Sequence, residues 1–131
     1  MGVAGGAATN ADAQALLGSI RQAGKTAGVL NIDGDLMPLV SRKSSLPNYA
    51  ASGHVEGQAA LIMRERGVSS AELLIDNPNG ICSYCTSQVP TLLPEGAQLM
   101  VRPPLGTVPT QWWFNGRTFL GNAANPKPSP W

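Results

Sequence analysis

The sequence predicts an α/β fold, a three-layer α/β/α sandwich in which helices cover both faces of a mixed sheet of about five strands. Segments with helical spacing of apolar residues alternate along the chain with short apolar segments of strand character. Such alternation is typical of a sheet packed between two layers of helices. We expect no helix between the last two strands, so these strands should pair antiparallel.

Turn and cap residues place the expected elements. Asn10 is the expected N-cap of the first helix, and Gly67 the C-cap of the second. Asp33-Gly34 is a hairpin turn between the first two strands. In chain order, we expect a helix at 11–22, strands at 26–32 and 36–40, a helix at 51–66, a strand at 71–76, a helix at 82–93, and strands at 98–102 and within 111–120.

Composition sets the size and the class of the protein. The chain has 131 residues, of which 43% are hydrophobic. We expect one domain over residues 1–131, because a chain of this length can bury a core without disulfides. We expect the ends, at 1–10 and 121–131, to be flexible. No apolar run approaches the length of a membrane span, and the N-terminal residues show no features of a signal peptide. The two cysteines are too few for a disulfide-dense scaffold.

The charges are unevenly distributed, although the net charge is only +1. All eight acidic residues lie at or before Glu95, and Arg102, Arg117 and Lys127 follow it without an acid. Small basic surpluses are common on soluble surfaces, but such a stretch can also follow a phosphate backbone. The composition by itself gives no strongly basic footprint for nucleic acid.

The residues best suited to chemistry fall in two short motifs. The only histidine is His54, in His54-Val55-Glu56, and the only cysteines are Cys82 and Cys85. Each motif stands at the start of an expected helix, and the two cysteines, at i and i+3, face the same side of one turn. A neutral imidazole and two thiolates form a ligand set that zinc favours.

Three such ligands leave one zinc position open, as in catalytic rather than structural zinc sites. On a regular helix Glu56 would be rotated about 200° from His54, so a role in proton transfer suits it better than joint ligation. This arrangement is the signature of hydrolytic deamination of a nucleobase, with the glutamate as a non-ligand. Ile81 stands where that signature usually has a proline.

Two other interpretations stay open at this point. Cys82-Ser83-Tyr84-Cys85 after a strand also suits a thioredoxin-like redox pair, which needs no metal and no role for His54. A zinc ion that only braces a binding module would require a fourth protein ligand and no bound water.

Several linked segments resemble the toxin deaminases of bacterial competition systems, and within them the DddA-type DNA cytosine deaminase toxins. The resemblance covers about residues 26 to 126. The segments that carry it are Pro47-Asn48-Tyr49-Ala50, Gly53-His54-Val55-Glu56-Gly57-Gln58, Met63-Arg64, Gly80-Ile81-Cys82-Ser83-Tyr84-Cys85, and Leu92-Leu93-Pro94-Glu95 followed by a strand and Pro103-Pro104.

The resemblance implies a cytidine-deaminase-like fold and conversion of cytosine to uracil in DNA. It implies one zinc ion per chain, with His54, Cys82 and Cys85 as ligands and Glu56 as the proton shuttle. It further implies the toxin domain of a larger secreted protein that acts in the target-cell cytoplasm and has a cognate immunity protein as partner. We expect a monomer without a membrane partner. Single- or double-stranded DNA, RNA and free nucleosides all stay open as substrates.

Candidate contacts to substrate or DNA come from the same segments and from the aromatic residues. Tyr49 and Tyr84 flank the proposed metal, where a flipped base needs walls on which to stack. Asn31 ends a strand expected to point into the site, although turn chemistry before Asp33-Gly34 explains it almost as well. The complete set is Asn31, Tyr49, Ser52, Ser83, Tyr84, Ser87, Phe119 and Lys127.

Overall fold

The computed structural model describes residues 10–43, 50–76, 83–104 and 116–122. Its elements are the helices α1 (Asn10–Ile20), α2 (Val55–Arg66) and α3 (Ser83–Leu92), the short 3₁₀ helix η1 (Ala50–Gly53), and the strands β2 (Ala27–Ile32), β3 (Asp35–Val40), β4 (Ser70–Asp76), β5 (Gln98–Arg102) and β6 (Arg117–Leu120). Among the described residues, no helix is long and apolar enough to span a membrane.

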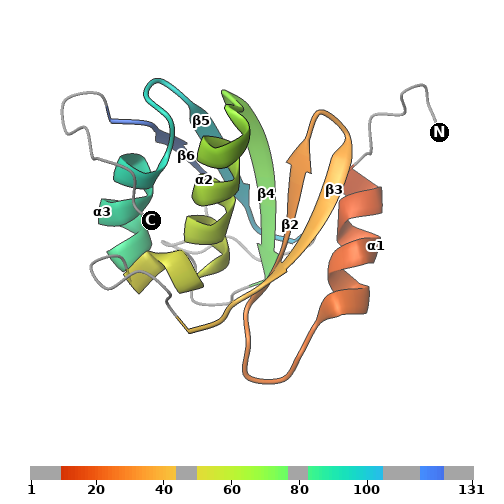
Figure 1. The fold of residues 1–131 in the computed structure, drawn as a ribbon. Coiled ribbons are helices and arrows are strands. Elements are labelled where there is room, and N and C mark those ends of the chain that lie inside the picture. The colour runs from red at the N-terminus through yellow and green to blue at the C-terminus, as the bar shows by residue number, and fades with distance from the viewer. Residues whose placement is uncertain (1–9, 44–49, 77–82, 105–115, 123–131) are drawn as a thin grey trace.

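The strands form one mixed sheet of five strands in the order β3-β2-β4-β5-β6. Among the described strands, β4 and β5 are the only neighbours that pair in parallel, and β5 and β6 pair antiparallel, as the sequence predicts. Helix α1 packs on one face of the sheet, whereas α2 and α3 cover the other (Figure 1). The predicted three-layer α/β/α sandwich is therefore confirmed.

Local chemistry explains the element boundaries. Asp33 and Gly34 both have positive φ, 51° and 94°, which is the backbone of a two-residue type I′ hairpin turn. Gly67 ends α2 in the left-handed conformation at φ 65°. The second helix begins later than predicted, at Val55 rather than near residue 51, because residues 50–53 form η1 and His54 is extended.

The register of the sheet fixes where the helices start. Val40 at the end of β3 and Asp76 at the end of β4 both pair with Ala27, so these two strands finish at the same end of the sheet. β5 runs parallel to β4 and finishes there too. We call this end the carboxyl end. The chain leaves it to enter η1 and α2 after β3, and α3 after β4, so both helices begin at the carboxyl end.

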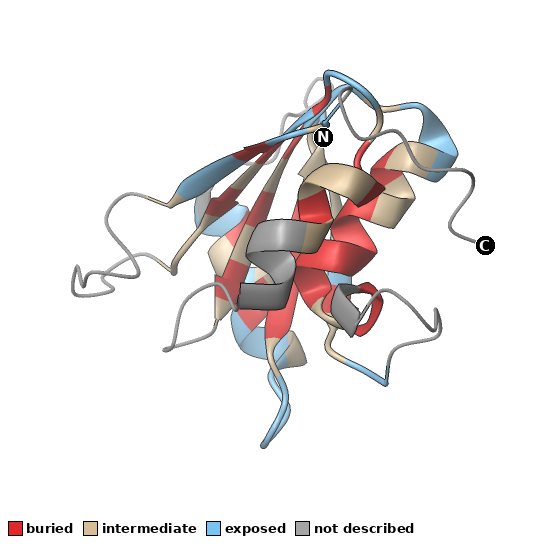
Figure 2. Cartoon of the chain, turned by 90° about the vertical axis from the view of Figure 1, so that its left-hand side faces the viewer, coloured by how far each residue is buried: buried red, intermediate tan, exposed pale blue. Residues whose placement is uncertain are grey.

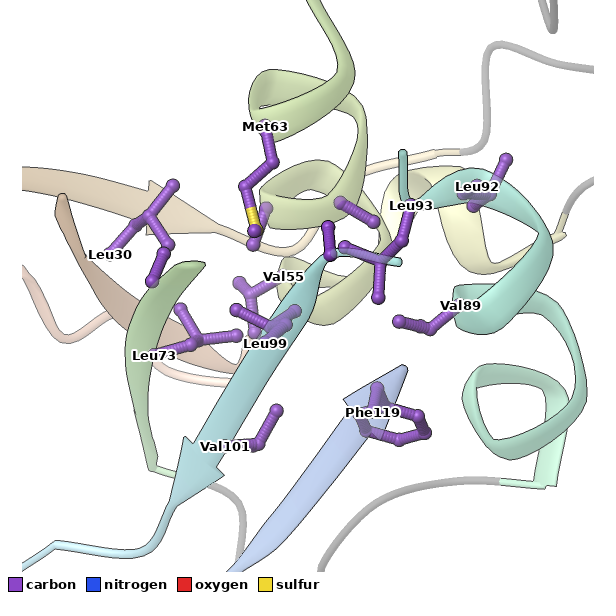
Figure 3. Close-up of a cluster of buried hydrophobic side chains, with 14 of the residues drawn as sticks. Leu30, Val55, Met63, Leu73, Val89, Leu92, Leu93, Leu99, Val101 and Phe119 are labelled. Atoms are coloured by element: carbon purple, nitrogen blue, oxygen red, sulfur yellow. The ribbon is translucent and has the colours of Figure 1, made fainter. Parts of the chain in front are cut away.

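Each face of the sheet carries its own apolar cluster. The smaller cluster, under α1, contains Ala13, Leu17, Ala27 and Val29. The larger cluster lies between the sheet and the helices α2 and α3, where buried residues concentrate (Figure 2). Its residues include Leu30, Val55, Met63, Leu73, Val89, Leu92, Leu93, Leu99, Val101 and Phe119 (Figure 3).

A proline leaves a carbonyl near the end of α3 free to accept a hydrogen bond from the chain that follows β6. Pro94 has no N–H to donate to the carbonyl of Pro90 four residues earlier, and the N–H of Asn122 donates to that carbonyl instead, at 2.9 Å. The N–H of Gly121 donates to the carbonyl of Ala97 at 2.8 Å. A Cβ on Gly121 would overlap the carbonyl of Pro94, so this junction requires glycine.

The start of α2 lies directly against the backbone of β2. A Cβ on Gly28 would lie 3.2 Å from both Cβ and Cγ2 of Val55, and 3.3 Å from Cδ1 of Leu73. Val55 is fully buried and is the first residue of α2. A glycine in the strand therefore allows the helix to approach the sheet this closely.

Gly28→Ala should destabilise the protein by about 1–3 kcal/mol, because the added methyl overpacks the contact between β2 and Val55. Gly18→Ala is the matched control, since a Cβ at Gly18 in α1 meets nothing within 4 Å. That control should gain up to about 1 kcal/mol from helix propensity. Urea unfolding of both variants measures the difference, and equal stability of the two would contradict the close packing of α2.

Candidate active site

Buried polar side chains mark one place in the molecule. Among the described residues, the polar or charged side chains that are buried are Ser52, Glu56 and Gln58, which are 1%, 3% and 7% exposed. All of them lie between residues 52 and 58, on either side of His54, at the carboxyl end of the sheet. Burial of polar groups costs free energy unless they find partners, and no buried side-chain nitrogen or oxygen among the described residues lacks one, so specific polar contacts concentrate in this segment.

His54 occupies the N-cap position of α2 with extended backbone, at φ −79° and ψ 151°. Its side chain makes no capping hydrogen bond. Histidine is not among the residues that helix N-caps favour, so helix capping does not account for it. Because His54 precedes the helix, the helical angle of about 200° expected between it and Glu56 does not describe their geometry.

Glu56 lies in the first turn of α2 and is almost completely buried. The first turn of a helix stabilises negative charge through its unsatisfied N–H groups. Val55 lies between His54 and Glu56 and packs on the sheet at Gly28. The packing of Val55 therefore fixes the backbone from which both functional side chains extend.

The start of α3 lies beside this segment. Helix α3 contacts both η1 and α2, and its first turn lies at the carboxyl end of the sheet (Figure 1). Cys85 is in that first turn, but its side chain, like those of Ser83, Tyr84 and Ser87, is not among those described. Cys82 lies outside the described residues. The backbone thus brings the histidine segment and the first turn of α3 to the same end of the molecule.

No group of three or more His, Cys, Asp or Glu side chains that could hold a metal occurs within the part of the chain that the structure describes. That part excludes Cys82 and the Cys85 side chain, so the ligand set of His54, Cys82 and Cys85 stays a prediction. Of the predicted substrate contacts, Ser52 is buried in η1 next to the site. Tyr49 and Lys127 lie outside the described residues.

The substrate contact predicted for Asn31 is wrong on position. Strand β2 begins at the carboxyl end with Ala27, so Asn31 lies toward the opposite end of the sheet. Alternate strand residues share a face, which places Asn31 with Val29 on the α1 side. Its Oδ1 accepts a hydrogen bond of 2.8 Å from the N–H of Gly34. The structure supports the turn interpretation of this residue.

Phe119 is a core residue rather than a stacking surface for DNA. It is 3% exposed and packs in the large apolar cluster near Val89 (Figure 3). The guanidinium carbon of Arg117 lies over its ring, 5.1 Å from the centroid. Arg117 pairs with Val101 near the end of β5, which places it at the carboxyl end. Sequence reasoning noted Arg117 only as part of the acid-free C-terminal stretch.

The comparison with known families agrees with this site. A family model described as SCP1.201-like deaminase matches residues 8–113, which is most of the chain. The chain belongs to the SCP1.201-like deaminase family. The predicted enzyme class, a deaminase, is therefore confirmed.

One relative narrows the comparison further. Over 83 residues, the chain is 47% identical to Double-stranded DNA deaminase toxin A of Burkholderia cenocepacia (strain H111). The match covers 62% of this chain and 6% of that protein, so the chain spans only a small part of the relative's length. The resemblance to toxin deaminases of the DddA type is confirmed.

Proposed function

We propose that this chain is a zinc-dependent deaminase that converts cytosine to uracil in DNA, as the toxin domain of a bacterial competition system. Family membership and the similarity to a DNA deaminase toxin support this proposal. The structural observation that carries it is the buried carboxylate of Glu56, two residues from His54 at the end of the sheet where α3 begins.

The donor set fits zinc. His54, Cys82 and Cys85 supply one imidazole and two thiolates, which leaves a fourth position for a water molecule or the substrate. The contact between α3 and η1 supports the approach of the cysteine turn to the histidine segment. Bound zinc would supply the activation of a water molecule near neutral pH.

Glu56 would handle the protons of the reaction. Hydrolysis adds water at the ring carbon that bears the amino group and releases ammonia. The Glu56 carboxylate would take a proton from the attacking water and pass protons to the ring nitrogen and to the leaving amine. Burial of Glu56 keeps bulk water from competing for these protons.

The substrate and partners follow from the same relationship. The name of the relative specifies double-stranded DNA as its substrate. For this chain we propose DNA as the substrate, in single- or double-stranded form. A toxin of this kind would be delivered to the cytoplasm of a target cell. The producing cell would need a cognate immunity protein that binds the domain.

Glu56→Gln should lower the deamination rate at least about 100-fold, because the amide cannot accept the proton from water. Zinc content and unfolding free energy should stay near those of the parent protein. Glu65→Gln is the matched control, since Glu65 is exposed on the same helix. Uracil is read by sequencing after incubation with matched single- and double-stranded DNA, with RNA and free cytidine in parallel.

Full activity of Glu56→Gln would contradict the proposed proton transfer. Deamination of RNA or cytidine alone would contradict DNA as the substrate while leaving the site intact. Disulfide turnover in a protein without zinc would favour a redox module instead.

Arg117→Gln should weaken DNA binding and reduce the salt dependence of binding, with a change in slope of about 0.9 for duplex or about 0.7 for single strands. We expect this change because the Arg117 side chain is exposed at the carboxyl end of the sheet, where its charge would pair with a phosphate of the bound DNA. The control is Arg66→Gln, since Arg66 is exposed at the opposite end of α2. Salt titrations use the Glu56→Gln background so that the DNA is not altered, and equal slopes for both variants would remove Arg117 from the DNA interface.

A further inference from the structure

We infer that Gln58 is a positioning residue for His54, which holds the peptide groups on both sides of His54 and ties them to the sheet. This inference rests on the proposed function, in which His54 is a zinc ligand. It adds a residue that needs no contact with metal or substrate.

The two peptide groups that flank the Cα of His54 are both held by this one residue. The backbone N–H of Gln58 donates to the carbonyl of His54 at 2.9 Å. The side-chain Nε2 of Gln58 donates to the carbonyl of Gly53 at 3.0 Å. Rotation about φ or ψ of His54 would move one of these carbonyls away from its donor. Gln58 therefore holds the extended backbone of His54 and the direction of its Cα–Cβ bond.

The same side chain joins this segment to the sheet. Nε2 of Gln58 also donates to the carbonyl of Val40, the last residue of β3, at 2.8 Å. The N–H of Arg42 donates to the carbonyl of Gly53 at 2.8 Å, which adds a second link between the end of β3 and η1. These bonds therefore fix the segment before His54 relative to strand β3.

Burial indicates that the amide of Gln58 serves these bonds. Gln58 is 7% exposed, in a helix whose neighbouring residues Gly57, Ala59 and Ala60 are buried as well. A side-chain amide has two N–H donors, and both find acceptors here. An apolar side chain of similar size would fill the space without the cost of burying an amide, so packing alone does not explain glutamine.

The consequence for the site is geometric. Metal and catalytic side chains must be held within about 0.5 Å of their productive positions. The carbonyl of His54 accepts the first backbone hydrogen bond of α2, but the peptide group before His54 lies outside the helix, so the helix alone fixes only one side of this residue. Without the two bonds from Nε2, the carbonyl of Gly53 would keep only its bond from Arg42, and the peptide group before His54 would be held less firmly.

Gln58→Met removes both donors at nearly constant volume and tests this inference. We expect zinc affinity, measured by competition with a chromogenic chelator, to fall about 10–100-fold, the usual effect of losing a residue that supports a metal ligand. We expect kcat for deamination to fall with little change in KM, because the substrate contacts are untouched. Gln22→Met is the matched control at an exposed glutamine and should change neither quantity.

A second variant and a second control separate positioning from general stability. Gln58→Asn keeps the amide but shortens its reach by one methylene, and it should lose zinc affinity in the same direction; it also carries the test if Gln58→Met does not fold. Ala13→Gly lowers stability in α1, on the other face of the sheet, and should leave zinc affinity unchanged.

Unchanged zinc affinity and kcat in a folded Gln58 variant, with zinc and activity present in the parent protein, would overturn the positioning role and leave the proposed function standing. A parent protein that binds no zinc would overturn both. Equal losses of zinc affinity in Ala13→Gly and Gln58→Met would also overturn the positioning role of Gln58, since lower stability alone would then account for the effect.

Discussion

The contact between the first residue of α2 and the backbone of β2 is the constraint on which the rest of the site depends. Val55 packs so closely against Gly28 that a Cβ on the strand would lie 3.2 Å from its side chain, a tighter contact than side chains usually make. Because Val55 separates His54 from Glu56, this packing sets the height of both side chains above the sheet. It also encloses the first turns of α2, so the polar groups there must find partners inside the protein. Gln58 meets that requirement because its side-chain amide donates hydrogen bonds to the carbonyls of Val40, at the end of β3, and Gly53, at the end of η1.

The second half of the site depends on a different anchor. Helix α3 begins at the carboxyl end of the sheet, and its far end is bonded to the chain that follows β6 through Pro90 and Asn122. The core beneath it, including Val89 and Phe119, holds the helix against the last strands. One helix is therefore fixed at its start and the other at its end, and both first turns face the same end of the sheet. A metal site built between two first turns gains rigidity from packing that lies outside it.

The three-layer fold, the hairpin and the motif residues could be predicted from the sequence because each depends on residues that lie close together in the chain. Asp33-Gly34 and Gly67 are positions where backbone conformation limits the choice of residue. The extended backbone of His54 was not predicted, because the spacing of apolar residues suggested one helix over residues 51–66. Sequence reasoning placed Asn31 at the wrong end, because the direction of β2 depends on pairing with distant strands. Gln58 belonged to a segment that carries the family resemblance, but its role was not predicted, since its acceptor on Val40 is distant in sequence and a glutamine in a helix usually indicates a surface.

We propose that one zinc ion is held between the start of α2 and the start of α3. X-ray absorption at the zinc edge tests it most directly, on protein purified with zinc and without added DNA. We expect two sulfur ligands at about 2.3 Å and nitrogen or oxygen ligands at about 2.0–2.1 Å, with one zinc ion per chain. A zinc shell without two sulfur ligands would contradict it. So would a metal-free protein in which Cys82 and Cys85 are joined as a disulfide.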